Sequence, residues 1–257
     1  YEISGNGKKP LVLLHGFMED HTIWSDMESH FSKEFTLIKI DLSGHGKSEN
    51  NNAVNSMDFM AEKVKEVIEK LNLNKINILG HSMGGYVSLA FAEKFPESIE
   101  SLTLFFSTTL ADDEEKKQIR RRSIAVIDEN FETFVNTSIP NLFSNNEKDI
   151  LEGKIELAKK IAKSTNKEGV KAAQLGMAER PDRTEILEKL EAKILIIAGK
   201  YDNAVKTENL LKIIPDKTNI KTYVLDCGHC GHWEKPTICA EIINTELLHN
   251  LPKKLVF

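Results

Sequence analysis

The segment Gly80-His81-Ser82-Met83-Gly84 constrains the fold of this chain more than any other feature. It fits G-x-S-x-G, a pattern in which a serine occupies a sharp turn between a strand and a helix. Residues 76–79 predict a short buried strand before it, and residues 85–92 predict a buried helix that ends before Pro96. Small residues on both sides of the serine let the backbone turn tightly. We therefore expect Ser82 to be an exposed nucleophile, and a plain glycine-rich turn is the alternative.

Strands and helices alternate along the chain, which favours an α/β fold. An amphipathic helix over 57–71 has apolar residues at helical spacing and can be capped by Ser56 or Asp58. The strands are short and almost continuously apolar, as strands buried on both faces are. They are expected at 11–14, 36–40, 76–79, 102–106, 194–198 and 221–225. The order predicts a mostly parallel central sheet with helices on both faces.

The pattern changes between residues 109 and 184, where no strand is evident and charged residues dominate. Interleaved apolar positions such as Ile124, Ile127, Phe131 and Phe134 indicate helices. We expect a helical cap over 109–184, inserted in a core domain formed by 1–108 and 185–257. The alternative is that these helices simply belong to the main domain.

A serine hydroxyl needs a base, and the base needs an orienting acid. In parallel sheets such groups gather at the carboxyl ends of the strands. His229 and His232 follow the last expected strand, and Asp202 follows the strand at 194–198. The order serine, aspartate, histidine is the one expected for a G-x-S-x-G turn in this type of sheet.

Several rivals to these residues remain. Asp226, Asp112 and Asp113 are alternative acids, although Asp226 is more typical of an ordinary turn residue. Asp202 is preferred because it follows the right strand. The remaining histidines near the motifs are expected to be loop residues that hydrogen-bond locally: His21, His45 and His81.

An acyl-enzyme intermediate also requires two backbone N–H donors for its oxyanion. Met83, directly after the serine, is expected to supply one, and Phe17 in the turn His15-Gly16-Phe17 the other. His15 and Gly16 are also expected to stabilise that turn.

Taken together, the motifs resemble the α/β-hydrolase fold superfamily, in its branch of small capped serine esterases, lactonases and carbon–carbon bond hydrolases. The matching segments are 15–17, 41–48, 80–85, 199–202 and 228–236. In this branch the catalytic histidine follows a glycine and precedes an acidic residue by five positions. The resemblance therefore implies His229 as the base, with Glu234 as the acidic residue and His232 as a neighbour.

The same resemblance implies a carboxylesterase-like activity without a cofactor, on a small-molecule ester. Dehalogenases and epoxide hydrolases of this fold carry aspartate where Ser82 stands, so those activities are disfavoured. A lactonase, a thioesterase, a carbon–carbon bond hydrolase and a non-catalytic receptor of the same fold remain alternatives.

The cap and the turn before it supply candidates for an apolar pocket. Besides Phe17, Met83, His15 and Gly16, these are Trp24, Phe131, Phe134 and Phe143. Ordinary core packing is the alternative for each aromatic residue. The run Arg120-Arg121-Arg122 suggests a carrier protein as partner, but the acidic residues before it favour a solvated helix face instead.

Composition bounds what the chain can bind. A net charge of −5 gives no basic surface for nucleic acid, and no apolar run has the length of a membrane span. Three cysteines are too few for a disulfide scaffold, which favours a cytoplasmic protein. The cluster Cys227-Gly-His229-Cys230-Gly-His232 is too compact to wrap a metal ion tetrahedrally, so no metal is expected. The start of the chain shows no signal-peptide pattern. Because the chain begins at Tyr1 rather than Met, we expect that a short leader or first strand is missing. The oligomeric state is not predicted.

Overall fold

The computed structural model describes residues 1–248. Seven strands form one sheet: β1 (Glu2–Ser4), β2 (Lys9–Leu14), β3 (Phe35–Ile40), β4 (Ile76–His81), β5 (Ile99–Phe105), β6 (Lys193–Gly199) and β7 (Ile220–Leu225). The α-helices are α1 (Ser25–Glu28), α2 (Met57–Lys70), α3 (Met83–Lys94), α4 (Glu114–Ser138), α5 (Glu152–Ser164), α6 (Lys167–Glu179), α7 (Glu185–Lys189), α8 (Thr207–Leu211), α9 (Gly231–Glu234) and α10 (Pro236–Leu248). Short 3-10 helices are η1 (His21–Trp24), η2 (Pro96–Ser98), η3 (Ile139–Leu142) and η4 (Asn145–Glu147).

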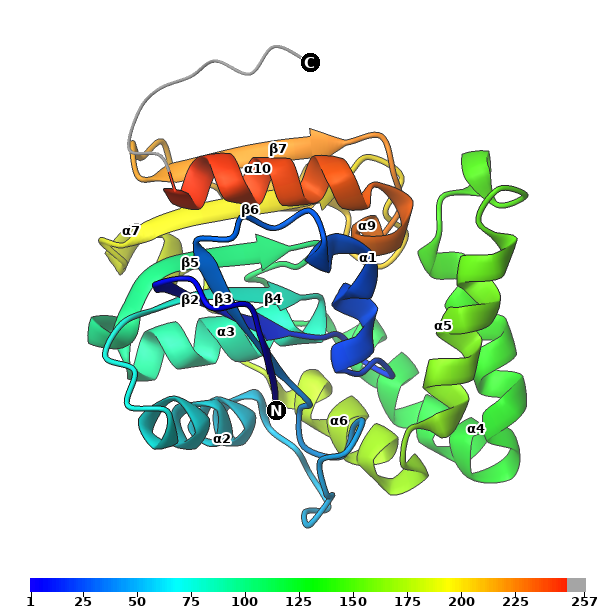
Figure 1. Ribbon diagram of the computed structural model, residues 1–257. Coiled ribbons are helices and arrows are strands. Elements are labelled where there is room, and N and C mark those ends of the chain that lie inside the picture. Colours follow the sequence, from blue (N-terminus) through cyan, green and yellow to red (C-terminus); the bar gives the residue numbers. More distant parts are fainter. Residues whose placement is uncertain (249–257) are drawn as a thin grey trace.

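The sheet has the strand order β1-β3-β2-β4-β5-β6-β7 (Figure 1). Only β1 runs antiparallel to its neighbour, and the other pairs are parallel. The predicted α/β fold with a mostly parallel sheet is therefore confirmed. The three-residue strand β1 was not anticipated, because so short a segment carries no measurable period.

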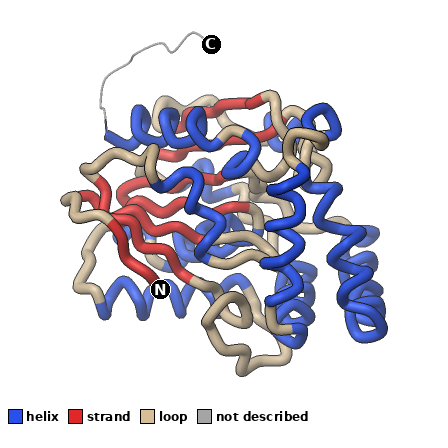
Figure 2. Tube along the Cα trace, turned by 45° about the vertical axis from the view of Figure 1, so that its right-hand side comes forward, coloured by secondary structure: helices blue, strands red, loops and turns tan. Residues whose placement is uncertain are grey.

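Alternating side chains along the strands build two hydrophobic cores, one on each face of the sheet. In β2, Val12 and Leu14 enter one core, while Leu11 and Leu13 enter the other. Helices α2 and α3 pack on the first face, whereas α1 and α10 pack on the second (Figures 1 and 2). Burial on both faces explains why the strands are almost continuously apolar.

Helix α2 illustrates how local sequence sets these elements. The Ser56 side chain accepts a hydrogen bond from Phe59 N–H and caps the helix. One stripe of α2 is buried against the sheet and consists of Met57, Met60, Ala61, Val64 and Ile68.

Helices α4, α5 and α6 lie beyond the carboxyl ends of the strands, where the arrowheads point in Figure 1. Asp113 caps α4 by accepting from Lys116 N–H, and Asn130 interrupts the helical backbone with φ −153° and ψ 85°. These helices occupy the chain between β5 and β6, and we propose that they form the cap expected over 109–184. Among residues 1–248, no helix is both long and apolar enough to cross a bilayer.

Candidate active site

Ser82 occupies a strained turn between β4 and α3. Its backbone has φ 50° and ψ −112°, which an L-residue adopts at a cost on the order of 1–3 kcal/mol. The turn can form because Gly80 and Gly84 lack side chains: an added Cβ would lie 2.2 Å from Gly84 O and 2.3 Å from Leu14 O, respectively. Ser82 N–H donates to Phe105 O at 3.0 Å, which ties the turn to β5.

The turn after β2 lies next to this serine and is held by two side chains. His15 Nε2 accepts from Leu42 N–H at 2.9 Å, so its Nδ1–H donates to Gly16 O at 2.7 Å. Gly16 N–H in turn donates to Glu19 Oε2 at 2.6 Å. Within residues 1–248, neither Phe17 N–H nor Met83 N–H has a hydrogen-bond acceptor. Both expected oxyanion donors are thus free to bind a ligand.

Asp202 and His229 meet at the carboxyl ends of β6 and β7. His229 Nδ1 donates to Asp202 Oδ2 at 2.7 Å, and both side chains are almost fully buried. The other carboxylate oxygen, Oδ1, accepts from Ala204 N–H and Val205 N–H at 2.8 Å each. These bonds hold the carboxylate so that it orients the imidazole.

Glu234 organises the loop that carries His229. One of its carboxylate oxygens accepts from Gly228 N–H at 2.8 Å and Ser144 N–H at 3.1 Å, and the other accepts from Cys230 N–H at 3.1 Å. Burial raises the pKa of Glu234, although these hydrogen bonds oppose the shift. The acidic residue five positions after the histidine therefore shapes its loop and joins it to the segment after η3.

A cavity of about 290 Å³ contains both Ser82 and His229. Its apolar lining comes from the turn after β2, from α3 and from the segment between β5 and β6: Phe17, Met18, Tyr86, Phe134, Leu142 and Met177. Cavities of this size and composition typically bind small molecules.

The structure corrects part of the predicted pocket. Phe17 and Phe134 line the cavity. The other predicted residues are not among its lining residues: His15, Gly16, Trp24, Met83, Phe131 and Phe143. Trp24 and Phe143 are fully buried in the core instead. The Phe143 ring stacks on the Trp233 ring, with 5.9 Å between the ring centroids. Ordinary packing thus explains these aromatic residues, because apolar side chains near a site and in a core look alike in sequence.

The side of the cavity formed by α4 is positively charged. Asp112 is buried and forms ion pairs with Arg120 and, at 2.8 Å, with Arg180, while Lys116 Nζ lies 3.9 Å away. Burial would raise the pKa of Asp112, but the two guanidinium groups lower it. One carboxylate therefore balances three cations, two of which, Lys116 and Arg120, line the cavity.

This arrangement corrects the interpretation of the arginine run. Arg121 and Arg122 are exposed, as a solvated helix face requires, but the Arg120 side chain is only 14% exposed and points to Asp112 and Gln174. A single sequence cannot distinguish one partly buried arginine among three, because its carboxylate partner is set by tertiary packing.

The rival residues have other partners. Asp226 is exposed and pairs with Lys200 at 3.1 Å, and Asp113 caps α4. His232 is fully buried, and neither of its ring nitrogens has a hydrogen-bond partner within the described chain. His45 bonds locally to Ser43 O as expected.

Two histidines differ from the expected local bonding. His21 bonds to Asp41, and His81, the last residue of β4, contacts Glu19 and His229 O. The three cysteines are buried free thiols within residues 1–248.

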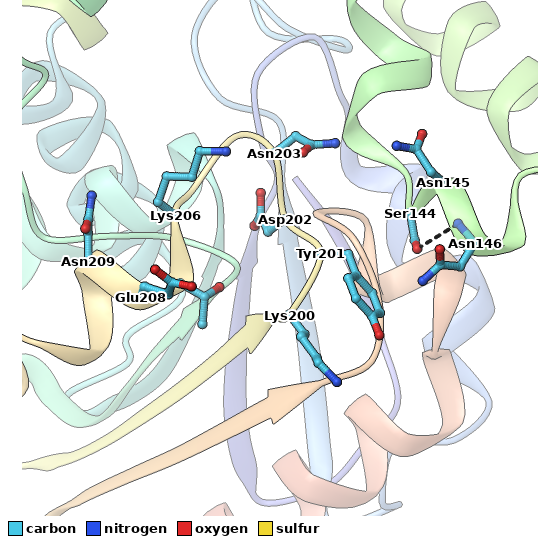
Figure 3. Close-up of a pocket in the computed structure, with 11 residues that line it drawn as sticks. Ser144, Asn145, Asn146, Lys200, Tyr201, Asp202, Asn203, Lys206, Glu208 and Asn209 are labelled. Carbon is cyan, nitrogen blue, oxygen red and sulfur yellow. Dashed lines mark hydrogen bonds between the residues drawn. The ribbon is translucent and has the colours of Figure 1, made fainter.

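A second, polar cavity of about 520 Å³ is lined in part by Asp202 (Figure 3). Asn203 and Lys206 lie beside Asp202 on the loop after β6, and Ser144 and Asn146 lie across from them at the start of η4 (Figure 3). It contains neither Ser82 nor His229, so the smaller cavity is the candidate active site.

Glu19 is the main residue of this site that the motifs did not reveal. It lies three residues after Gly16, is almost fully buried, and lines the cavity. The only signal in the sequence is an acidic residue directly after the apolar turn, which resembles any solvated loop residue.

Comparison with known proteins agrees with the fold. Residues 9–236 match the family described as alpha/beta hydrolase fold. The structure aligns with a TM-score of 0.89 to a thermophilic esterase from Thermogutta terrifontis in a malate-bound form. The two chains are 33% identical, and the alignment covers 94% of this chain and 90% of the esterase.

Two sequence relatives were compared over different lengths. A 2-hydroxy-6-oxononadienedioate/2-hydroxy-6-oxononatrienedioate hydrolase of Escherichia coli is 27% identical over 243 residues, which cover 90% of this chain and 84% of that enzyme. An uncharacterized protein of Mycobacterium tuberculosis is 33% identical over 104 residues, which cover 40% of this chain. That match spans only 30% of the mycobacterial protein's length.

Proposed function

Because this chain belongs to the alpha/beta hydrolase fold family, we propose that it is a serine hydrolase that cleaves a small carboxylic ester. Ser82 Oγ attacks the acyl carbon, and His229 Nε2 takes the serine proton and passes it to the leaving alcohol. Asp202 accepts from His229 Nδ1–H and stabilises the imidazolium. Water, activated by His229, then hydrolyses the acyl-enzyme.

Two backbone groups complete the proposed machinery. Phe17 N–H and Met83 N–H bind the oxyanion of each tetrahedral intermediate, which is usually the largest electrostatic contribution in acyl transfer. Met83 is also the first residue of α3, so the positive end of the helix dipole adds to its effect.

One observation supports this function most. His229 Nδ1 lies 2.7 Å from Asp202 Oδ2, and His229 lines the same cavity as Ser82. Ser82 is the only residue of the three with a left-handed backbone, which presents its side chain at the turn. The strained turn at Ser82 and the buried Asp202–His229 pair support the hydrolase over a non-catalytic receptor of the same fold.

The charged wall of the cavity favours a substrate that carries a carboxylate. Lys116 and Arg120 retain excess positive charge beside Asp112, and charge-assisted hydrogen bonds to a carboxylate are the strong ones. Two similar proteins agree with this chemistry: the Thermogutta terrifontis esterase has malate bound, and the Escherichia coli hydrolase is named for a dioate. We propose an ester whose acyl part carries such a group, without a cofactor.

Hydrolytic cleavage of a carbon–carbon bond is the second candidate. The Escherichia coli relative, matched over 90% of this chain, acts on such a substrate class by its name, an oxo-dienedioate. The same serine, histidine and oxyanion donors would serve both reactions, so the choice depends on substrate fit.

The proposal is tested with a fluorophosphonate probe followed by peptide mass mapping. We expect one label on Ser82, lost in Ser82→Ala and kept in Ser123→Ala, which alters a serine of α4 outside the cavity. A folded protein that takes no label would refute the serine hydrolase. A parallel turnover assay with nitrophenyl esters and oxo-dienoates then separates the two candidate reactions.

A further inference from the structure

Three buried titratable side chains lie beside the candidate active site. Glu19, His81 and His232 are 6%, 1% and 0% exposed. Glu19 Oε2 lies 2.8 Å from His81 Nδ1, and Glu19 Oε1 lies 3.7 Å from His232 Nε2. None of the three belongs to the serine, histidine and aspartate of the proposed mechanism, so their burial requires a separate explanation.

Both ring nitrogens of His81 face oxygen atoms that only accept. Nδ1 contacts the Glu19 carboxylate, and Nε2 contacts His229 O at 3.0 Å. A neutral imidazole has a single N–H and would leave one of these contacts without a proton. Only the doubly protonated imidazolium donates to both.

The charges around His81 agree with that state. Burial alone would lower the pKa of His81, but the attraction of Glu19 and its hydrogen bond raise it. Burial likewise opposes ionisation of Glu19, yet His81 lowers the pKa of Glu19 to about 2. Burial and then the charge of His81 keep the pKa of His232 well below its ordinary value. Of the two adjacent rings, His81 is therefore the cation.

We propose that Glu19 and the imidazolium of His81 form a buried ion pair that positions the oxyanion turn and the backbone of His229. Glu19 holds Gly16 N–H, which orients the turn whose next residue, Phe17, offers a free N–H. His81 holds the carbonyl of His229 and directly precedes Ser82 in the chain.

One ion pair thereby connects the ends of β2, β4 and β7, which carry the oxyanion turn, the nucleophile and the base. The neighbouring Met18 has φ 57°, a left-handed conformation that is unfavourable for a residue other than glycine. The turn therefore needs contacts that hold it in this conformation. Since a displacement of 1 Å in such a constellation can cost about a hundredfold in rate, a rigid link of this kind has catalytic value. This role rests on the proposed function.

The same three side chains could instead bind a divalent cation, because one ligand atom from each lies within 4.8 Å of the others. A metal ligand must offer a lone pair, whereas the imidazolium has a proton on each ring nitrogen. The ion pair and a metal site thus exclude each other, and they can be told apart experimentally.

The first experiment measures the protonation of His81 directly. In protein with ¹⁵N-labelled histidine rings at pH 8, NMR is expected to show protons on both ring nitrogens of His81, assigned by their loss in His81→Asn. The signals should be unchanged by added Co²⁺ or by a chelator. A neutral His81 ring, or one whose signals respond to Co²⁺, would overturn the proposal. This measurement needs no activity, so it remains decisive even if Ser82 takes no fluorophosphonate label.

The second experiment compares substitutions of Glu19 by the turnover of a nitrophenyl ester. Gly16 N–H and His81 Nδ1 both contact Glu19 Oε2, so the single amide oxygen of Glu19→Gln can accept from Gly16 N–H and from Nδ1–H of a neutral His81. Its kcat should therefore stay within about tenfold of the parent. Glu19→Met fills the same space without hydrogen bonds and should lose about a hundredfold in kcat with little change in KM.

A residue that only fills space would give the opposite pattern, with Met at least as active as Gln. Glu28→Ala serves as the control, because Glu28 is a partly buried carboxylate paired with Lys39 away from the cavity. Its kcat is expected to match the parent. Equal activity of the Gln and Met variants, with both folded by thermal unfolding, would refute the positioning role.

Discussion

Replacing Asp202 by asparagine tests the proposed triad most sharply, because the structure fixes how the new amide must sit. Oδ1 of Asp202 accepts from Ala204 N–H and Val205 N–H, both at 2.8 Å, while Oδ2 accepts from His229 Nδ1 at 2.7 Å. An amide has only one accepting oxygen. Turning its NH2 toward the two backbone donors would leave them unpaired, at on the order of 1–3 kcal/mol for each buried donor.

The amide oxygen should therefore remain with the backbone, and the NH2 should face His229. Nδ1 must then offer a lone pair, so the proton of the neutral ring moves to Nε2. That nitrogen can no longer accept the proton of Ser82. We expect kcat to fall about 10,000-fold, which corresponds to about 5 kcal/mol of lost transition-state stabilisation.

The assay is hydrolysis of a nitrophenyl ester at pH 7.5, with thermal unfolding measured on the same samples. The unfolding temperature should change little, because both backbone hydrogen bonds persist. Asp226→Asn is the matched control, since Asp226 is exposed and pairs only with Lys200 among the described residues. If Asp202→Asn kept kcat within tenfold of the parent while Asp226→Asn lost activity, the assignment of the acid would be wrong.

Three further outcomes are expected. Gly84→Ala places a Cβ 2.3 Å from Leu14 O and should destabilise the protein by at least about 1–3 kcal/mol in urea unfolding. Gly153→Ala meets no atom within 4 Å beyond its chain neighbours and its own helix backbone, so it should stabilise α5 by about 0.5–1 kcal/mol. A Gly84→Ala variant more stable than Gly153→Ala would contradict the turn geometry. The pKa of Glu19 is lowered from 4.5 to about 2 in the folded protein, so its contribution to stability is complete above pH 4.5 and is lost as the pH falls toward 2. Urea unfolding of the parent should weaken more between pH 5 and pH 3 than that of Glu19→Gln, and equal slopes would exclude an ionised Glu19. Arg120→Ala should raise KM about tenfold for a nitrophenyl ester with a terminal carboxylate, but not for a neutral ester of equal length; an equal change for both would remove the argument for an anionic substrate.

Local patterns were sufficient to predict the α/β fold. The spacing of apolar residues in segments such as 11–14 and 57–71 is set by residues close along the chain, and each spacing is compatible with few types of secondary structure. The mostly parallel sheet follows because strands alternate with helices. The strand β1 escaped because three residues carry too little pattern, and the expected cap over 109–184 remains a proposal.

In the candidate site, too, the residues placed by local elements were easier to predict than those placed by tertiary packing. Ser82, Asp202 and His229 could be proposed from the sequence because they lie one, three and four residues after strands, so their positions relative to the sheet follow from local elements. The choice of His229 over His232 came from the family resemblance. The pocket aromatics were predicted less well: Trp24 and Phe143 are core residues, whereas Phe134 lines the cavity. A side chain's apolar character does not say which of two neighbouring spaces it fills.

By itself, the sequence determined the order of strands and helices, the strained turn at Ser82 and the candidates for its partners, because these depend on residues close along the chain. Only the tertiary structure decided the contacts between distant segments. Glu19 and His81 are 62 residues apart, and Arg180 reaches Asp112 across 68 residues. Whether a buried charge is paired depends on where two remote backbones bring their side chains, and no local period encodes that distance.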